Sequence, residues 1–142
     1  MLKIKLLHPD AKVPTRANET DAGLDLYALE DCIVLQNQVA MVKTGVAMAI
    51  PTGYAGVIHP RSGLAIRHGV DRLAGLIDSD YRGELIAALT TVKRWQFEIK
   101  AGDRIAQLVI QKVELWNPVV VDELDETERG DNGFGSTERL GK

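Results

Sequence analysis

The sequence predicts an all-β domain of the sandwich, jelly-roll or barrel type. Its apolar residues recur mostly with a period of two, and turn-forming residues separate the apolar runs at short intervals. Alternation of this kind is typical of strands with one buried face, whereas an amphipathic helix shows a period near 3.6. Many short strands at close spacing favour a sandwich or barrel over an α/β fold.

The individual elements can be followed along the chain. Residues 2–6 (LKIKL) and 46–50 (VAMAI) alternate, so each is expected to be a strand with one buried face. The best helix candidate is Ser62–His68, and it is short. Turn signals punctuate the chain at 21–23, 51–53, 82–83 and 101–103. No internal repeat or linker divides residues 1–121, which we interpret as one β domain.

The composition changes at residue 122. Residues 122–131 hold six acids and one base, Arg129, and the large apolar residues from 122 to 142 are only Leu124, Phe134 and Leu140. Such a segment cannot bury enough apolar surface to offset the entropy lost on ordering. We therefore expect residues 122–142 to be a flexible C-terminal arm, with an acidic linker before a glycine-rich end.

Size and composition exclude several classes of protein. A chain of 142 residues with 45% apolar residues has room for one domain with a real core. A net charge of -3 argues against a general nucleic-acid binder, so any anionic ligand must be held by a few local arginines. No apolar run approaches the ~18 residues of a membrane helix. The single cysteine, Cys32, excludes an internal disulfide, and we expect a cytoplasmic protein without nucleic-acid or membrane partners.

Three segments combine glycine with groups that bind anions or activate water. PRSGLA at 60–65 has an arginine and a hydroxyl before the predicted helix, where free N–H groups bind anions; the alternative is a capped turn. In LIDSDYRGE at 76–84, Asp78 and Asp80 face one side of an extended chain, within reach of a bound water, or else they mark a polar hairpin end. RGDNGFGST at 129–137 has the composition of an anion-binding flap, although composition alone favours a solvated tail.

In their order along the chain, these segments resemble motifs of the trimeric dUTPase family, the dUTP nucleotidohydrolases. The five motifs are AGLDLYA at 22–28, PRSG at 60–63, GLIDSDYRGE at 75–84, GDRIAQL at 102–108 and RGDNGFGST at 129–137. The resemblance implies a β jelly roll and a homotrimer whose active sites are shared among three subunits. It also implies Mg²⁺-dependent hydrolysis of dUTP to dUMP and pyrophosphate, which keeps uracil out of DNA and supplies dUMP for thymidylate synthesis.

The resemblance assigns roles to residues of the third motif. Asp78 positions or deprotonates the water that attacks the α-phosphorus. Tyr81 packs under the deoxyribose and excludes UTP by clash with the ribose hydroxyl. Main-chain groups of a β-hairpin at 71–78, among them Gly75, Leu76 and Ile77, read uracil. Arg72 stands where many bacterial members have asparagine, so we expect the backbone to carry more of the reading.

The other motifs are implied to hold the triphosphate and its metal. The phosphate-binding residues are Arg61, Ser62, Gly63 and Gln107 in the body and Arg129, Gly135, Ser136 and Thr137 in the arm. Phe134 stacks over uracil when the arm closes. Mg²⁺ sits on the phosphates and waters, and Asp25 holds one of those waters. Asn132 and Glu138 replace glycines usual in the family, and the charge of Glu138 is expected to weaken closure.

Other interpretations remain at this point. A dCTP deaminase shares the fold but lacks the DxDYRGE sequence and the glycine-aromatic arm, and ammonia release from dCTP would identify it. A non-catalytic nucleotide-sensing regulatory protein would not need Asp78, Tyr81 and the arm motif together. His8, His59 and His68 lack metal-ligand spacing, so we expect them to be structural or surface residues.

Overall fold

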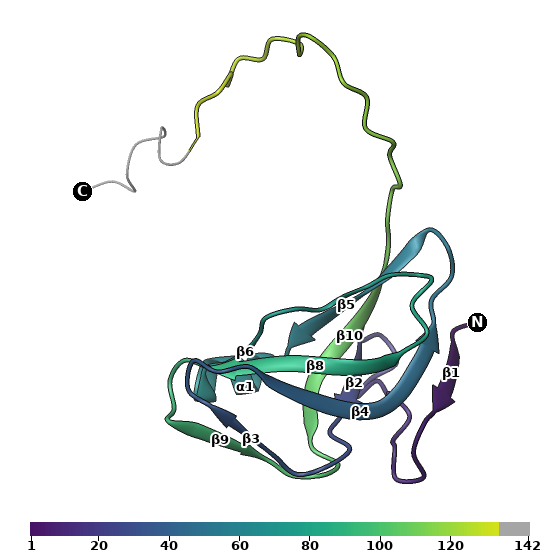
Figure 1. The fold of residues 1–142 in the computed structure, drawn as a ribbon, viewed down its shortest axis with the longest axis vertical. Helices are drawn as coiled ribbons and strands as arrows, with labels where there is room; N and C mark the ends of the chain where they lie inside the picture. Colours follow the sequence, from purple (N-terminus) through teal and green to yellow (C-terminus); the bar gives the residue numbers. More distant parts are fainter. Residues whose placement is uncertain (134–142) are drawn as a thin grey trace.

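The computed structural model describes residues 1–133, which form two four-stranded sheets and one two-stranded sheet (Figure 1). The first large sheet has the order β1 (Lys3–Leu6), β4 (Ala40–Ala49), β8 (Glu84–Thr91), β6 (Val70–Arg72). The second has the order β2 (Gly23–Tyr27), β10 (Arg104–Lys112), β5 (Tyr54–Pro60), β7 (Leu76–Ile77). The third pairs β3 (Cys32–Leu35) with β9 (Gln96–Ile99). Every pair of these strands is antiparallel, and the all-β prediction is confirmed.

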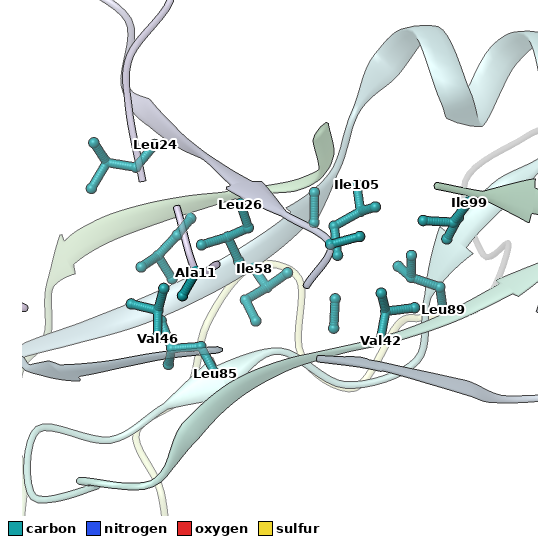
Figure 2. Packing of buried hydrophobic residues seen from close by; sticks show 14 of the residues in the cluster. Ala11, Leu24, Leu26, Val42, Val46, Ile58, Leu85, Leu89, Ile99 and Ile105 are labelled. Carbon is teal, nitrogen blue, oxygen red and sulfur yellow. The ribbon is translucent and has the colours of Figure 1, made fainter. Parts of the chain in front are cut away.

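One apolar cluster takes side chains from both large sheets (Figure 2). On β2, Leu24 and Leu26 are 8% and 0% exposed and belong to this core. Because neighbouring side chains of a strand point to opposite faces, Asp25 between them faces away from the core. The alternation that builds the core therefore also presents this carboxylate on the outer face of the sheet.

The two strands located by alternation differ in burial. On β4, Val46 and Met48 are 1% and 2% exposed, which confirms a strand with these side chains in the core, but Ala47 between them is 5% exposed, so both faces are buried there instead of one. At β1, Leu2, just before the strand, and Ile4 are half-buried against the core as expected, whereas Leu6 is 44% exposed, so the predicted buried face does not extend to the end of this strand. The physical reason is that β1 lies at the edge of its sheet and pairs with β4 alone, so fewer side chains cover it.

The helix, α1 (Ser62–His68), has the predicted limits. It ends at Gly69, whose φ of 68° lies in the left-handed region that glycine adopts without steric cost. The Gly69 N–H donates to the Ala65 carbonyl at 2.9 Å and closes the last turn. Within residues 1–133, no helix has the length and apolar character needed to cross a membrane.

Residues 71–78 do not form the expected hairpin. Strand β6 pairs with β8, whereas β7 pairs with β5, so the two arms belong to different sheets. The Leu73 N–H donates to the Ala88 carbonyl at 3.0 Å, and the Gly75 carbonyl accepts the Ile58 N–H at 2.8 Å. The longer strands β8 and β5 thus satisfy backbone groups that a hairpin would have paired with each other.

The sheets end earlier than the change in composition at residue 122. The Val113 N–H still donates to the Gly53 carbonyl at 2.9 Å, but β10 ends at Lys112. From there the described chain runs away from the body as an extended segment (Figure 1). We call residues 115–121 the apolar stretch; in it Leu115, Trp116 and Val120 are 72%, 84% and 99% exposed. This stretch lies outside the sheets, although its composition grouped it with the β domain.

A surface carboxylate ties the start of β3 to the turn after β9. Asp31 accepts hydrogen bonds from the Ala101 N–H at 2.9 Å and from Lys100 Nζ at 3.1 Å. The backbone hydrogen bond first, and Lys100 second, lower the pKa of Asp31 below its ordinary value of 3.8. Because the folded pKa is depressed, this contribution to stability is present above pH 3.8 and is lost as the pH falls through the folded pKa.

We predict that Asp31→Asn lowers the urea midpoint of unfolding at pH 6. The difference in midpoint between variant and wild type should shrink as the pH falls below 3.8 and through the folded pKa of Asp31. Urea titrations at a series of pH values, at fixed protein concentration, measure this. Asp122→Asn, in the exposed segment, is the control and should leave the midpoint unchanged. A constant Asp31→Asn deficit down to pH 2 would contradict the linkage.

Candidate functional site

A cleft of about 750 Å³ opens where helix α1 meets strands β2, β5 and β10. Four of the predicted phosphate-binding residues line it: Arg61, Ser62, Gly63 and Gln107. Asp25, the predicted partner of a metal-bound water, lines it as well. The structure therefore brings together residues from the first, second and fourth motifs, which lie far apart in sequence.

Asp25 is held between two arginines. Its Oδ1 lies 3.3 Å from Arg61 Nε and its Oδ2 lies 3.3 Å from Arg104 Nη1. The Asp25 side chain is only 13% exposed, so solvent screens these pairs less than it screens surface pairs. The three charged groups of this cluster carry one net positive charge, although Arg104 itself does not line the cleft and Asp21 does. Sequence reasoning missed Arg104, although it lies in the fourth motif beside Gln107.

The position of Arg61 is fixed twice. Besides its Nε contact with Asp25, its Nη1 donates to the Arg104 carbonyl at 3.3 Å. Arg61 is also the residue that precedes helix α1, and no side chain caps that helix. The first N–H groups of a helix have no intrahelical partner, so those of Ser62 and Gly63 are available to an anion. A Cβ at Gly63 would meet no atom of this chain within 4 Å, so packing within the chain does not require a glycine there.

A second glycine allows Gln107 to lie in the cleft. Gln107 on β10 is paired with Asp25 of β2, and its Nε2 donates to the Pro60 carbonyl at 3.3 Å. A Cβ at Gly23 would lie 2.7 Å from Gln107 Oε1 and 3.1 Å from its Cβ. The glycine of the first motif is therefore needed for the close approach of the Gln107 side chain.

The residues of the third motif lie elsewhere. Asp78, Tyr81 and Arg72 do not line the cleft. The loop with Asp78 and Tyr81 leads into the start of β8, where Glu84 pairs with Ala47 (Figure 1). Helix α1 lies near the other end of β8, where Thr91 pairs with Val70. The third-motif loop thus lies at one end of β8, and helix α1, which lines the cleft, lies at the other end, where Thr91 Oγ1 donates to the His68 carbonyl at 2.9 Å.

Tyr81 is fixed by its own loop. Its hydroxyl donates to the Glu84 carbonyl at 3.0 Å, and its N–H donates to the Asp78 carbonyl at 3.2 Å. A Cβ at Gly83 would collide with the ring of Tyr81, so the ring lies against a glycine. The Tyr81 side chain nevertheless keeps one exposed face, because the residue is 44% exposed. Asp78 is exposed beside it.

The remaining predicted contacts are distributed over two further segments. In 71–78, Leu76 is 67% exposed, Ile77 packs against the core, and the Gly75 carbonyl is used by Ile58. In the arm, Arg129 Nε donates to the Asn132 carbonyl at 2.9 Å and closes a local turn. Within the described part of the chain Asn132 does not adopt a positive φ; Gly130, at 55°, does. Phe134, Gly135, Ser136, Thr137 and Glu138 lie outside the described residues.

The chemistry of a metal site can also be tested on the described residues. No group of three His, Cys, Asp or Glu side chains among them can hold an ion. Asp25 and Asp21 are the carboxylates that line the cleft. This set of donors suits an ion that keeps most of its ligands from phosphates and water, which is how Mg²⁺ binds in many nucleotide sites.

Comparison with known proteins identifies the family. The family model described as dUTPase matches residues 9–138. The chain belongs to the dUTPase family. A deoxyuridine 5'-triphosphate nucleotidohydrolase of Corynebacterium efficiens is 48% identical over 141 residues, 97% of this chain and 78% of that relative. One from Paramecium bursaria Chlorella virus 1 is 46% identical over 136 residues, 96% of each chain.

Solved structures of dUTPases share the fold. The Staphylococcus bacteriophage 80alpha dUTPase with dUPNHPP matches with a TM-score of 0.90 and 31% identity, over 97% of this chain and 98% of that one. A mutant dUTPase from phage phi11 of S. aureus, described with a structural Mg(II) ion, matches with a TM-score of 0.82 and 27% identity, over 89% and 99%. The fold of this chain is thus the dUTPase jelly roll, as predicted.

We predict that Gly23→Ala weakens the binding of inorganic tripolyphosphate several-fold, because the new methyl group displaces the Gln107 amide from the cleft. Isothermal titration calorimetry measures the affinity. The control is the same change in a Gln107→Ala background, where the two effects should be strongly non-additive. Additive losses in the double variant would show that Gly23 does not act through Gln107.

Proposed function

We propose that this chain hydrolyses dUTP to dUMP and pyrophosphate, keeping uracil out of DNA and supplying dUMP for dTMP synthesis. The observation that carries the proposal is the match to the dUTPase family over residues 9–138. The cleft supports it, because Arg61, Ser62 and Gln107 line it and can donate hydrogen bonds to a polyphosphate. The net charge of -3 and the single half-buried cysteine are consistent with a cytoplasmic enzyme of nucleotide metabolism.

In this proposal Asp78 is the general base. An exposed carboxylate at the edge of a sheet can accept a proton from a water once a nucleotide is bound next to it. The water attacks the α-phosphorus, the bond to the bridging oxygen breaks, and pyrophosphate leaves. Tyr81 lies under the deoxyribose with its exposed ring face and excludes UTP through a clash with the 2′-hydroxyl.

Backbone groups of residues 71–78 are proposed to read uracil. Gly75, Leu76 and Ile77 carry those groups, and a slot built from backbone discriminates because a mismatched exocyclic group leaves polar atoms unpaired. Arg72 contributes little to this discrimination in our proposal, since uracil has no negative charge for a guanidinium to pair with.

We further propose that the enzyme is a homotrimer with shared active sites. Within one chain the third-motif loop does not line the cleft and enters β8 at the end opposite helix α1, which supports a site completed by the loop of a neighbouring copy. The apolar stretch, with Leu115, Trp116 and Val120 exposed, supports association because such surface is stabilised by burial in an interface. A symmetric ring of three copies repeats each shared site three times.

Mg²⁺ is the proposed cofactor. Its ligands would be the phosphates and waters, with Asp25 accepting a hydrogen bond from one of those waters and Arg61 remaining on the phosphates. When bound, the ion neutralises the triphosphate and fixes its geometry for in-line attack.

The arm, residues 122–142, is proposed to close over the nucleotide bound to the domain formed by 1–121. Arg129, Gly135, Ser136 and Thr137 would bind the phosphates, and Phe134 would stack over uracil. Closure excludes water and completes the site, which is how lids raise turnover. The negative charge of Glu138 opposes closure next to a polyphosphate.

One experiment tests the proposed function as a whole. Pyrophosphate release is measured with dUTP, dCTP, dTTP and UTP, each with and without Mg²⁺. We expect release from dUTP alone, and only with Mg²⁺. Ammonia release from dCTP would identify a deaminase instead, and tight dUTP binding without turnover would identify a nucleotide sensor.

For the catalytic base, we predict that Asp78→Asn leaves the fold and nucleotide affinity intact and lowers kcat by about 10²–10⁴, as expected for the loss of a general base. Stopped-flow proton release and calorimetry with a non-hydrolysable dUTP analogue separate turnover from binding. Asp80→Asn is the matched control, two residues along the same loop, and should stay close to wild type. A folded Asp78→Asn enzyme with near-normal kcat would rule out this role.

A further inference from the structure

We propose that His59 is an additional polyphosphate-binding residue, whose imidazole N–H donates a hydrogen bond to a phosphate oxygen. The inference rests on the proposed function, because the ligand is the triphosphate of the nucleotide. It reverses the expectation from sequence that His59 is a structural or surface residue.

The register of three strands brings His59 into the cleft. Gln107 on β10 is paired with Asp25 on β2 and with His59 on β5. Residues directly opposite each other in antiparallel strands project from the same face of the sheet. Asp25, Gln107 and His59 therefore form one row across the sheet, and all three line the cleft. Two members of this row already have proposed roles at the triphosphate.

The direction of His59 is fixed by its neighbours in the chain. It precedes Pro60, which restricts it to an extended backbone. The Pro60 carbonyl accepts the Gln107 amide at 3.3 Å, which holds β5 against β10 at this level. Arg61 comes directly after Pro60 in the sequence and forms an ion pair with Asp25. The imidazole thus lies on a well-fixed strand, two residues from the arginine that faces the same cleft.

The three histidine rings differ in their contacts within the described residues. His8 Nδ1 accepts the Asp10 N–H at 3.1 Å. The ring of His68 packs on Phe97, with centroids 5.1 Å apart, which fixes its orientation, although its buried Nδ1 has no hydrogen-bond partner. His59 is half-buried, yet among the described residues its ring makes no hydrogen bond or ion pair. The ring of His59 is therefore not tied to another group of the chain and is available to a ligand in the cleft.

The chemistry of an imidazole suits this position. The neutral ring has one N–H donor and the protonated ring has two, so a donor is present in either state. The cleft already contains Arg61 and Arg67, but the charge of Arg61 is partly offset by Asp25. His59 adds a donor to those of Arg61, Arg67 and Gln107 without adding a permanent charge.

The test compares His59→Leu, which removes the donor, with His59→Gln, which retains an N–H donor. Calorimetry measures the affinity of the full-length protein for inorganic tripolyphosphate and for deoxyuridine, which has no phosphate. We expect His59→Leu to weaken tripolyphosphate binding by about tenfold, as for one hydrogen bond to a charged group, and to leave deoxyuridine binding unchanged. His59→Gln should restore most of the affinity. His8→Leu, remote from the cleft, is the control.

Two results would overturn the inference: wild-type tripolyphosphate affinity in a folded His59→Leu protein, or equal losses for tripolyphosphate and deoxyuridine. If His59→Leu does not fold, ¹⁵N NMR of the wild-type imidazoles decides. The His59 signals should move on addition of tripolyphosphate while those of His8 stay, and unmoved His59 signals would also overturn it. The two proposals can also fail separately. If tripolyphosphate binding depends on His59 but the wild-type protein does not hydrolyse dUTP, the result supports the His59–phosphate contact and contradicts the proposed reaction.

Discussion

The paired contacts of Asp25 with Arg61 and Arg104 are the interaction on which the rest of the site depends. Without the carboxylate, two guanidinium groups would face each other in a partly buried cleft, and their repulsion would move both. With it, Arg61 is fixed beside the start of helix α1, and one surplus positive charge remains for an anion. Gly23 serves the same arrangement, because only a residue without a Cβ lets Gln107 lie beside this ion cluster.

The jelly roll separates two kinds of chemistry. Strands β2, β5 and β10 gather the anion-binding groups at one end, whereas the loop with Asp78 and Tyr81 enters β8 at the other. The apolar stretch after β10 leaves the body without covering its own side chains, and burial of that stretch would favour association of chains. The length of β8, which separates the loop with Asp78 from helix α1, therefore links the fold to the association of chains and to catalysis.

Part of the fold and part of the candidate site were predictable from sequence, and the physical reason differs from residue to residue. Alternation predicted β4, and the limits of α1 follow from Pro60 before it and Gly69 after it. The grouping of Asp25, Arg61 and Gln107 followed from the family motifs. By contrast, the place of His59 depends on the register of β5 against β10, and the contact of Arg104 depends on a side-chain position; neither has a local signal. The expected hairpin at 71–78 was wrong because long-range pairing with β5 and β8 replaced local pairing.

A mixture of two inactive variants tests whether Arg61 and Asp78 reach each site from different chains. Arg61→Ala lacks the anion-binding arginine, and Asp78→Asn lacks the base. Each is unfolded, refolded alone or in an equal mixture, and assayed for pyrophosphate release from dUTP. The account predicts that the mixture recovers roughly one quarter of wild-type activity, because each of the two contributing neighbours is the intact one half of the time. A mixture as inactive as the separate variants, with mixed assembly confirmed by native mass spectrometry, would show that each site is built within a single chain and would contradict the account.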